Sequence, residues 1–147
     1  METRRTIEVT KKVVIEQSDI SNLLATALYD GITYWCPKFE VNGKLADDGR
    51  DYEDKVAEHL FKGGKVTFYE DEGEEGNEED FIEHTVSLDD FVKGIGTYLR
   101  DGGNPSCLTE ESRGGKEQVT AIEWGDIDAI EADAMIQYIC FREVIYG

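Results

Sequence analysis

The densest group of chemically active side chains in this sequence is a run of carboxylates at residues 70–80. Eight of these eleven residues are acidic and none is basic. The acids are Glu70, Asp71, Glu72, Glu74, Glu75, Glu78, Glu79 and Asp80. Repulsion at this density contributes nothing to folding, so the run is either a solvated loop or a negative surface that meets something positive. We call residues 70–80 the acidic crest.

Carboxylates at this density raise the question of a metal site. A calcium loop needs acids at positions 1, 3 and 5, Gly at position 6 and Glu at position 12. A loop that starts at Asp71 places Gly73 at position 3 and Ile82 at position 12, and one that starts at Asp47 places Gly49 at position 3. Zinc needs three or four nitrogen or sulfur ligands at suitable spacing, which two separated histidines and three scattered cysteines do not supply. The sequence therefore predicts no metal and no cofactor.

Motifs for catalysis are missing as well. The sequence has no Gly-x-Ser-x-Gly, no His-Glu-x-x-His and no cysteine–histidine signature. Its glycine pairs at 63–64 and 114–115 do not lie between a predicted strand and a predicted helix, as a phosphate-binding loop requires. So many acids always allow a carboxylate pair, but no spacing selects one. We interpret the chain as a non-enzyme.

The aromatic pair Tyr34 and Trp35 is the second candidate for a functional role. It belongs to the apolar run at residues 32–36, and such a run is typical of buried structure. The alternative is a ligand-stacking or anchoring role, because Tyr and Trp are favoured at the centres of interfaces. Both interpretations stay open from the sequence.

The whole chain is strongly acidic. Its 147 residues hold 33 Asp and Glu against 15 Lys and Arg, a net charge of −18. This balance disfavours direct contact with nucleic-acid phosphates or with an anionic membrane. No apolar run approaches the length of a spanning helix and no signal-peptide core is present, so we expect a cytoplasmic protein with free thiols. The charge is compatible with solubility alone or with a basic protein partner.

We expect the acidic crest to form the tip of a hairpin over residues 65–87. Residues 65–69 and 81–86 show the alternation of half-buried strands, with Val66 and Phe68 on one and Ile82 and Val86 on the other. The flanking side chains Tyr69, Phe81 and Glu83 belong to the same candidate partner-binding surface.

The remaining segments predict one α+β domain over residues 1–147, in which an antiparallel sheet carries about four helices, mainly on one face. Apolar periodicity and capping residues predict helices over residues 19–30, 51–62, 88–100 and 128–141. β-branched residues predict further strands over residues 6–15, 119–124 and 144–146. The Gly, Asn, Pro and Ser content of residues 101–117 predicts a flexible loop.

Several short motifs together resemble a known family. They are Ala-Leu at 27–28, Gly-Ile-Thr-Tyr-Trp-Cys at 31–36, Gly-Gly at 63–64 and Ala-Asp-Ala-Met-Ile-Gln-Tyr at 132–138. These motifs are similar to those of small, uncharacterised proteins of tailed phages and prophages of Gram-positive bacteria (Firmicutes). The resemblance implies a setting in the host bacterial cytoplasm, where small phage accessory proteins occupy host proteins, defence nucleases among them. It assigns no active-site residue.

Three functions follow as hypotheses. The favoured one is an inhibitor that blocks a basic, nucleic-acid-binding host protein by nucleic-acid mimicry, as an anti-CRISPR or anti-restriction protein does. Carboxylates on one strand face repeat at about twice the strand rise of about 3.3 Å, which is close to the span of two phosphate repeats of about 3.4 Å each, so acids on a hairpin roughly imitate phosphate spacing. Four acids were expected to extend this surface: Asp47, Asp48, Asp51 and Asp54.

Two alternatives belong to other classes. In the first, the protein sequesters a nucleotide immune signal, with Tyr34 and Trp35 stacked on the base. Four basic residues would then lie near the phosphates: Lys62, Lys65, Arg113 and Lys116. In the second, the protein is a phage structural or interaction module. The sequence leaves the partner's identity and the oligomeric state open.

Overall fold

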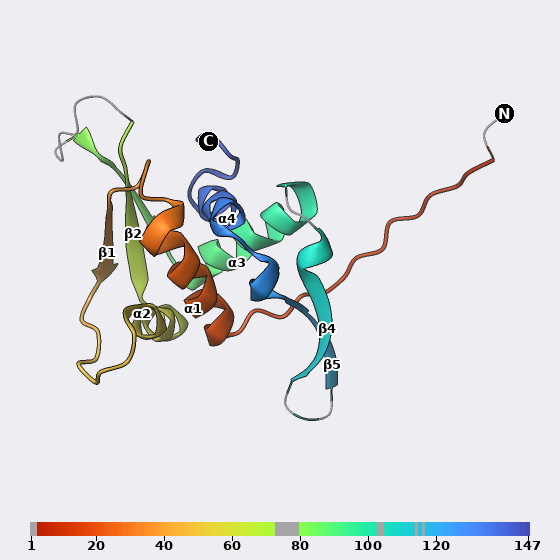
Figure 1. Ribbon diagram of the computed structural model, residues 1–147, viewed down its shortest axis with the longest axis horizontal. Helices are drawn as coiled ribbons and strands as arrows, with labels where there is room; N and C mark the ends of the chain where they lie inside the picture. The colour runs from red at the N-terminus through yellow and green to blue at the C-terminus, as the bar shows by residue number, and fades with distance from the viewer. Residues whose placement is uncertain (1–2, 73–79, 103–104, 114, 116) are drawn as a thin grey trace.

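The structure is a computed structural model that describes residues 3–72, 80–102, 105–113, 115 and 117–147. Within these residues it has an α+β fold with four α-helices, as predicted (Figure 1). The helices are α1 (Gln17–Thr26), α2 (Tyr52–Phe61), α3 (Leu88–Thr97) and α4 (Ala129–Phe141). Short π-helical turns extend α1 over Ala27–Gly31 and α3 over Tyr98–Gly102.

The described strands form two small antiparallel sheets instead of the one sheet expected from the sequence. The three-stranded sheet has the order β1 (Lys38–Asn42), β2 (Lys65–Glu70) and β3 (Ile82–Val86). The two-stranded sheet pairs β4 (Leu108–Arg113) with β5 (Glu117–Ile122). Short 3-10 turns lie at Pro105–Cys107 and Trp124–Asp126. The helices lie between the two sheets in Figure 1.

Helix α3 shows how local sequence sets these elements. Ser87 caps its first turn reciprocally with Asp90, because each side chain accepts a hydrogen bond from the backbone N–H of the other. The buried ring of Phe91 packs on Phe68 of β2, with ring centroids 6.1 Å apart. Gly94 lies against α4 so closely that an added Cβ would be 2.5 Å from the Cα of Ile139. The close packing of α3 and α4 therefore depends on a missing side chain.

The predicted strand over residues 6–15 does not form. Only Val13 pairs, in one isolated parallel bridge to Thr120, where the N–H of Val14 donates to the Thr120 carbonyl at 2.9 Å. Residues 3–12 are exposed and extend away from the body (Figure 1). β-branched composition alone does not make a strand, because a strand exists only where a neighbouring edge supplies hydrogen bonds.

Two other segments differ from expectation. The predicted flexible loop over residues 101–117 contains β4, which pairs with β5 from Leu108 opposite Ile122 to Arg113 opposite Glu117. The predicted terminal strand over residues 144–146 is an extended tail without strand pairing. β4 forms because it pairs in a hairpin with the strand that follows it, whereas the tail is held by side-chain hydrogen bonds to Gln137 and Glu70 and not by a strand.

Candidate functional site

Part of the acidic crest is described and part is not. Residues 73–79, which include Glu74, Glu75, Glu78 and Glu79, lie outside the described residues. At the two strand ends, Glu72, Asp80 and Glu83 are exposed, whereas Asp71, Tyr69 and Phe81 are half-buried. The strands that carry the crest form as predicted, with Glu70 paired opposite Ile82 as the last pair.

Glu70 is a correction to the predicted partner-binding set. It is only 5% exposed, because the alternation of β2 places it on the inward face with Val66 and Phe68. One of its carboxylate oxygens lies 2.8 Å from Nε2 of His84, and the other accepts a hydrogen bond from the Tyr146 hydroxyl. Both oxygens are therefore engaged inside the protein and are not available to a partner.

The Glu70 carboxylate joins three elements at the base of the crest. It comes from β2, His84 comes from β3, and Tyr146 comes from the tail after α4. Burial and the hydrogen bond to Glu70 raise the pKa of Tyr146, so its hydroxyl stays a donor near neutral pH. Gln137 fixes the tail independently, since its side-chain oxygen accepts from the backbone N–H groups of Ile145 at 2.8 Å and Tyr146 at 2.9 Å.

A second buried carboxylate, Asp133, holds the aromatic pair. The indole N–H of Trp35 donates to it at 2.7 Å, the Gln137 amide donates at 2.9 Å, and the Tyr34 hydroxyl donates as well. Burial, with the bond to Asp133, raises the pKa of Tyr34 to about 12. Trp35 is 1% exposed and stacks on Tyr146 with ring centroids 5.7 Å apart.

These contacts separate the two aromatic candidates. The core interpretation is confirmed for Trp35, and its ring is not free to stack on a ligand. Tyr34 is 56% exposed, so its ring remains a surface candidate although its hydroxyl is bound. The backbone N–H of Asp71 donates to the Trp35 carbonyl at 2.9 Å, which ties the aromatic loop to the start of the crest.

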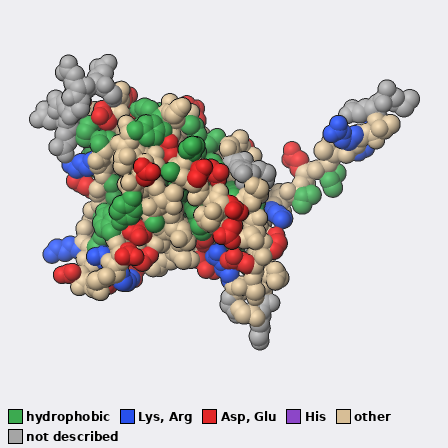
Figure 2. All heavy atoms as spheres, viewed as in Figure 1, with side chains coloured by type: hydrophobic (Ala, Val, Ile, Leu, Met, Phe, Trp, Pro, Cys, Tyr) green, Lys and Arg blue, Asp and Glu red, His purple; other side chains and the backbone are tan. Residues whose placement is uncertain are grey.

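Exposed apolar side chains gather at the same end of the three-stranded sheet. They are Tyr34, Ile82, Val144 and Ile145. Their placement follows from the contacts above, because the aromatic loop, the β3 start and the tail all meet at Glu70 and Asp71. Figure 2 shows hydrophobic and acidic side chains side by side on the body near the β2–β3 end. We call the described crest acids other than Glu70, which are Asp71, Glu72 and Asp80, together with these four apolar residues the hairpin-end surface.

The loop acids expected to extend this surface lie elsewhere. In β1, Lys38 pairs with Tyr69 near the crest, whereas Asn42 pairs with Lys65 at the opposite end. The segment after Asn42, which carries these four acids, therefore leaves the sheet at the end away from the crest (Figure 1). Asp48 forms a salt bridge with Arg50, and Asp54 accepts a hydrogen bond from Ser21. This part of the prediction is wrong.

The basic residues expected to bind nucleotide phosphates are engaged or dispersed. Arg113 lies 3.0 Å from Asp19 and 3.1 Å from Glu16, and its bond to buried Asp19 raises its pKa. Lys62 pairs with Glu58 at 3.0 Å. Lys116 lies outside the described residues. With Trp35 buried, the proposed stacking and phosphate groups do not converge on one pocket.

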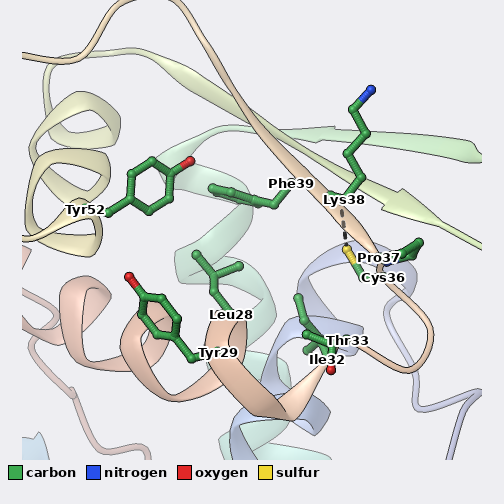
Figure 3. A pocket seen from close by; sticks show the side chains of 9 residues that line it. All are labelled: Leu28, Tyr29, Ile32, Thr33, Cys36, Pro37, Lys38, Phe39 and Tyr52. Atoms are coloured by element: carbon green, nitrogen blue, oxygen red, sulfur yellow. Dashed lines mark hydrogen bonds between the residues drawn. The ribbon is translucent and has the colours of Figure 1, made fainter.

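A small cavity of about 220 Å³ opens between the end of α1, β1 and the start of α2 (Figure 3). The side chains of Leu28, Tyr29, Phe39 and Tyr52 surround it, and Tyr29 and Tyr52 present hydroxyls at its rim. Binding pockets for drug-sized ligands span about 300–1,000 Å³. This cavity is suited to a single side chain of a partner and is too small for a nucleotide.

Both histidines have structural partners. His59 Nε2 lies 3.1 Å from the Lys65 carbonyl, and His84 lies against Glu70. No cluster of three metal-ligating side chains occurs in the part of the chain that the structure describes. Within the same residues, no helix combines the length and the apolarity that crossing a bilayer demands.

The chain matches no protein-family model, no curated protein and no solved structure. Functional inference therefore rests on the residues and their contacts. Sequence reasoning missed Glu70 as a buried hub, and it missed Asp133 and Gln137. The available signal was the strand alternation that places Glu70 on the face of Phe68.

Replacing Glu70 with Ala is expected to lower the free energy of unfolding by about 1–3 kcal/mol, because buried hydrogen-bond partners lose their acceptor. Glu72→Ala is the matched control: it also removes a crest carboxylate, but Glu72 is exposed and the change should stay within about 0.5 kcal/mol. Urea denaturation of both variants measures the difference. Equal stability of the two would show that the Glu70 cluster does not hold the hairpin base.

Proposed function

We propose that the protein binds and blocks a basic, nucleic-acid-binding host protein through the hairpin-end surface, in the manner of an anti-CRISPR or anti-restriction inhibitor that imitates nucleic acid. One observation carries the proposal. The buried Glu70 cluster fixes β2, β3 and the C-terminal tail together, so the crest starts from an ordered base beside exposed apolar side chains.

The charge of the chain suits this role. At −18 it attracts a basic surface over long range, and steering of this kind accelerates association. Eight carboxylates without a base concentrate the negative charge at the crest. A groove that binds nucleic acid presents the complementary Lys and Arg. Binding should therefore weaken as ionic strength rises.

Affinity requires more than charge, because exposed charges at the rim of an interface mainly set the association rate. Tyr34, Ile82, Val144 and Ile145 supply apolar area beside the acids. Tyr is among the residue types enriched at binding hot spots. Because the tail and both strands are held by buried hydrogen bonds, little conformational entropy is lost there on binding.

The nucleotide-sequestering alternative has no comparable support. Trp35 is buried, Arg113 is held by Asp19, and the cavity in Figure 3 is smaller than a nucleotide site. No observation favours a phage structural module over an inhibitor. The hairpin-end surface therefore stands as the candidate binding site.

The apolar part of the proposal is tested with Ile82→Ser combined with Ile145→Ser. The pair is expected to speed dissociation of a captured basic partner about tenfold or more, because apolar anchors act on the dissociation rate. Ile130→Ser is the control, since Ile130 is 78% exposed on α4. Dissociation is followed by surface plasmon resonance. Equal dissociation rates for the double variant and the control would contradict this role.

A further inference from the structure

The N-terminal segment, residues 3–12, is the most exposed part of the described chain, and we call it the arm. Ile7 is 84% exposed and Val9 is 79% exposed. Figure 1 shows the arm leaving the body beside the β4–β5 hairpin, where Val13 bridges Thr120, and extending away from it. Alternating β-branched side chains that stay exposed to this degree are unfavourable in water. Their exposure points to a binding partner for this segment.

The arm differs from the body in charge. It carries Arg4, Arg5, Lys11 and Lys12 against Glu8, a net charge of +3. The whole chain has −18, so the other residues carry −21. Lys11 already lies 3.1 Å from Glu110 of β4 in the same chain. The body of this protein is therefore a chemically complementary partner for its own arm.

A hollow of about 850 Å³ lies between the root of the arm and α3. Val9 and Val13 line it on the arm side, and Val92, Ile95 and Leu99 line it on the side of α3 and its π-helical extension. Val92 is 42% exposed. Figure 2 shows the arm standing away from the body beyond this region. The apolar side chains of the arm side and those of the α3 side thus face each other across the hollow. The space between them is wide enough for an extended chain.

We propose that the arm of a second copy occupies this hollow, and that two chains exchange arms reciprocally to form a dimer. Ile7 and Val9 of the entering arm would pack against the α3 wall. The isolated bridge between Val13 and Thr120 shows that the arm root already adopts strand pairing. The entering arm takes the place of residues 8–11 of the chain's own arm, which line the hollow and leave it in the exchange. Reciprocal exchange closes the assembly at two copies.

The charge distribution selects the occupant. A nucleic acid would be attracted by the four bases of the arm but repelled by the remaining −21. In the dimer, the basic arm of each copy lies on the acidic body of the other copy. Opposite charges therefore meet at both contacts. The proposal does not depend on the hairpin-end surface, because the crest and the arm leave the body on different sides (Figure 1).

The test is sedimentation equilibrium of the full chain with two double variants. Wild-type protein is expected to dimerise with a dissociation constant that rises with salt. Ile7→Ser with Val9→Ser should raise that constant by about tenfold or more, as loss of central apolar anchors does. Thr6→Ser with Thr10→Ser is the control on the same arm and should leave the constant unchanged.

A variant on the receiving side completes the test. Val92→Ser should weaken dimerisation like the arm variant, and its circular dichroism spectrum and melting temperature report whether it remains folded. A wild-type chain that stays monomeric, or a dimer that ignores Ile7→Ser with Val9→Ser, would overturn the proposal. Arm-dependent binding of a DNA duplex by a monomer, read by fluorescence anisotropy, would overturn it in favour of a nucleic-acid partner.

Discussion

Replacing Gly94 with Ala is expected to cost about 2–3 kcal/mol in the free energy of unfolding, because the added methyl group overpacks the contact between α3 and α4. The added Cβ would lie 2.5 Å from both the Cα and the Cγ1 of Ile139. Ile139 lies in the last turn of α4, and its backbone atoms cannot move aside without separating the two helices. Urea denaturation monitored by circular dichroism measures the loss.

Gly96 gives the matched control on the same helix. A Cβ at Gly96 meets nothing within 4 Å, so Gly96→Ala tests helix propensity without a clash. That substitution should stabilise the protein by about 0.5–1 kcal/mol. Opposite signs at two glycines separated by one residue would establish the close contact of α3 with α4. A similar loss for both variants would contradict it.

Reversing the charge of four crest residues is expected to have the largest effect on binding. Replacement of Glu74, Glu75, Glu78 and Glu79 with Lys changes the net charge from −18 to −10, since each replacement adds two. Binding to a basic partner should fall by about a hundredfold or more at an ionic strength of about 0.15 M, because electrostatic attraction and its steering are lost. Affinity for the captured partner, measured by titration calorimetry, gives the result.

The control separates local charge from total charge. Lys replacements at four exposed acids outside the hairpin, Asp47, Asp101, Glu117 and Asp126, give the same net charge of −10. Binding should fall much less, because exposed charges beyond a Debye length of about 8 Å from the interface are screened. Equal losses for the two quadruple variants would show that the crest has no special role and that total charge alone governs binding.

Local signals in the sequence predicted much of the fold. The hairpin strands follow from the alternation of Val66 and Phe68, and α3 begins at the Ser87 capping box as expected. The predicted helix over residues 19–30 begins two residues earlier, at Gln17, because Glu16 is its N-cap. Glu16 binds reciprocally with Asp19, an acidic variant of the same capping logic.

Pairings between residues far apart in sequence were beyond local reasoning. In the sequence, Glu70 is indistinguishable from the other acids of the crest. Its buried position depends on a hydrogen bond from Tyr146, which lies 76 residues later in the chain. Trp35 and Asp133 meet across 98 residues. For residues 6–15 and for β4 the prediction followed composition, which does not show where a strand finds a pairing edge: residues 6–15 do not form the predicted strand, whereas β4 pairs with the following strand β5.

We propose that the crest end of the hairpin occupies a nucleic-acid-binding groove of a basic protein. Competition tests it most directly: proteins captured from a bacterial host extract by the immobilised chain are challenged with increasing DNA or RNA duplex. The account predicts that nucleic acid displaces the partner, that salt does the same, and that the crest charge-reversal variant captures none of it. A partner that stays bound to the chain and to nucleic acid simultaneously would contradict the account.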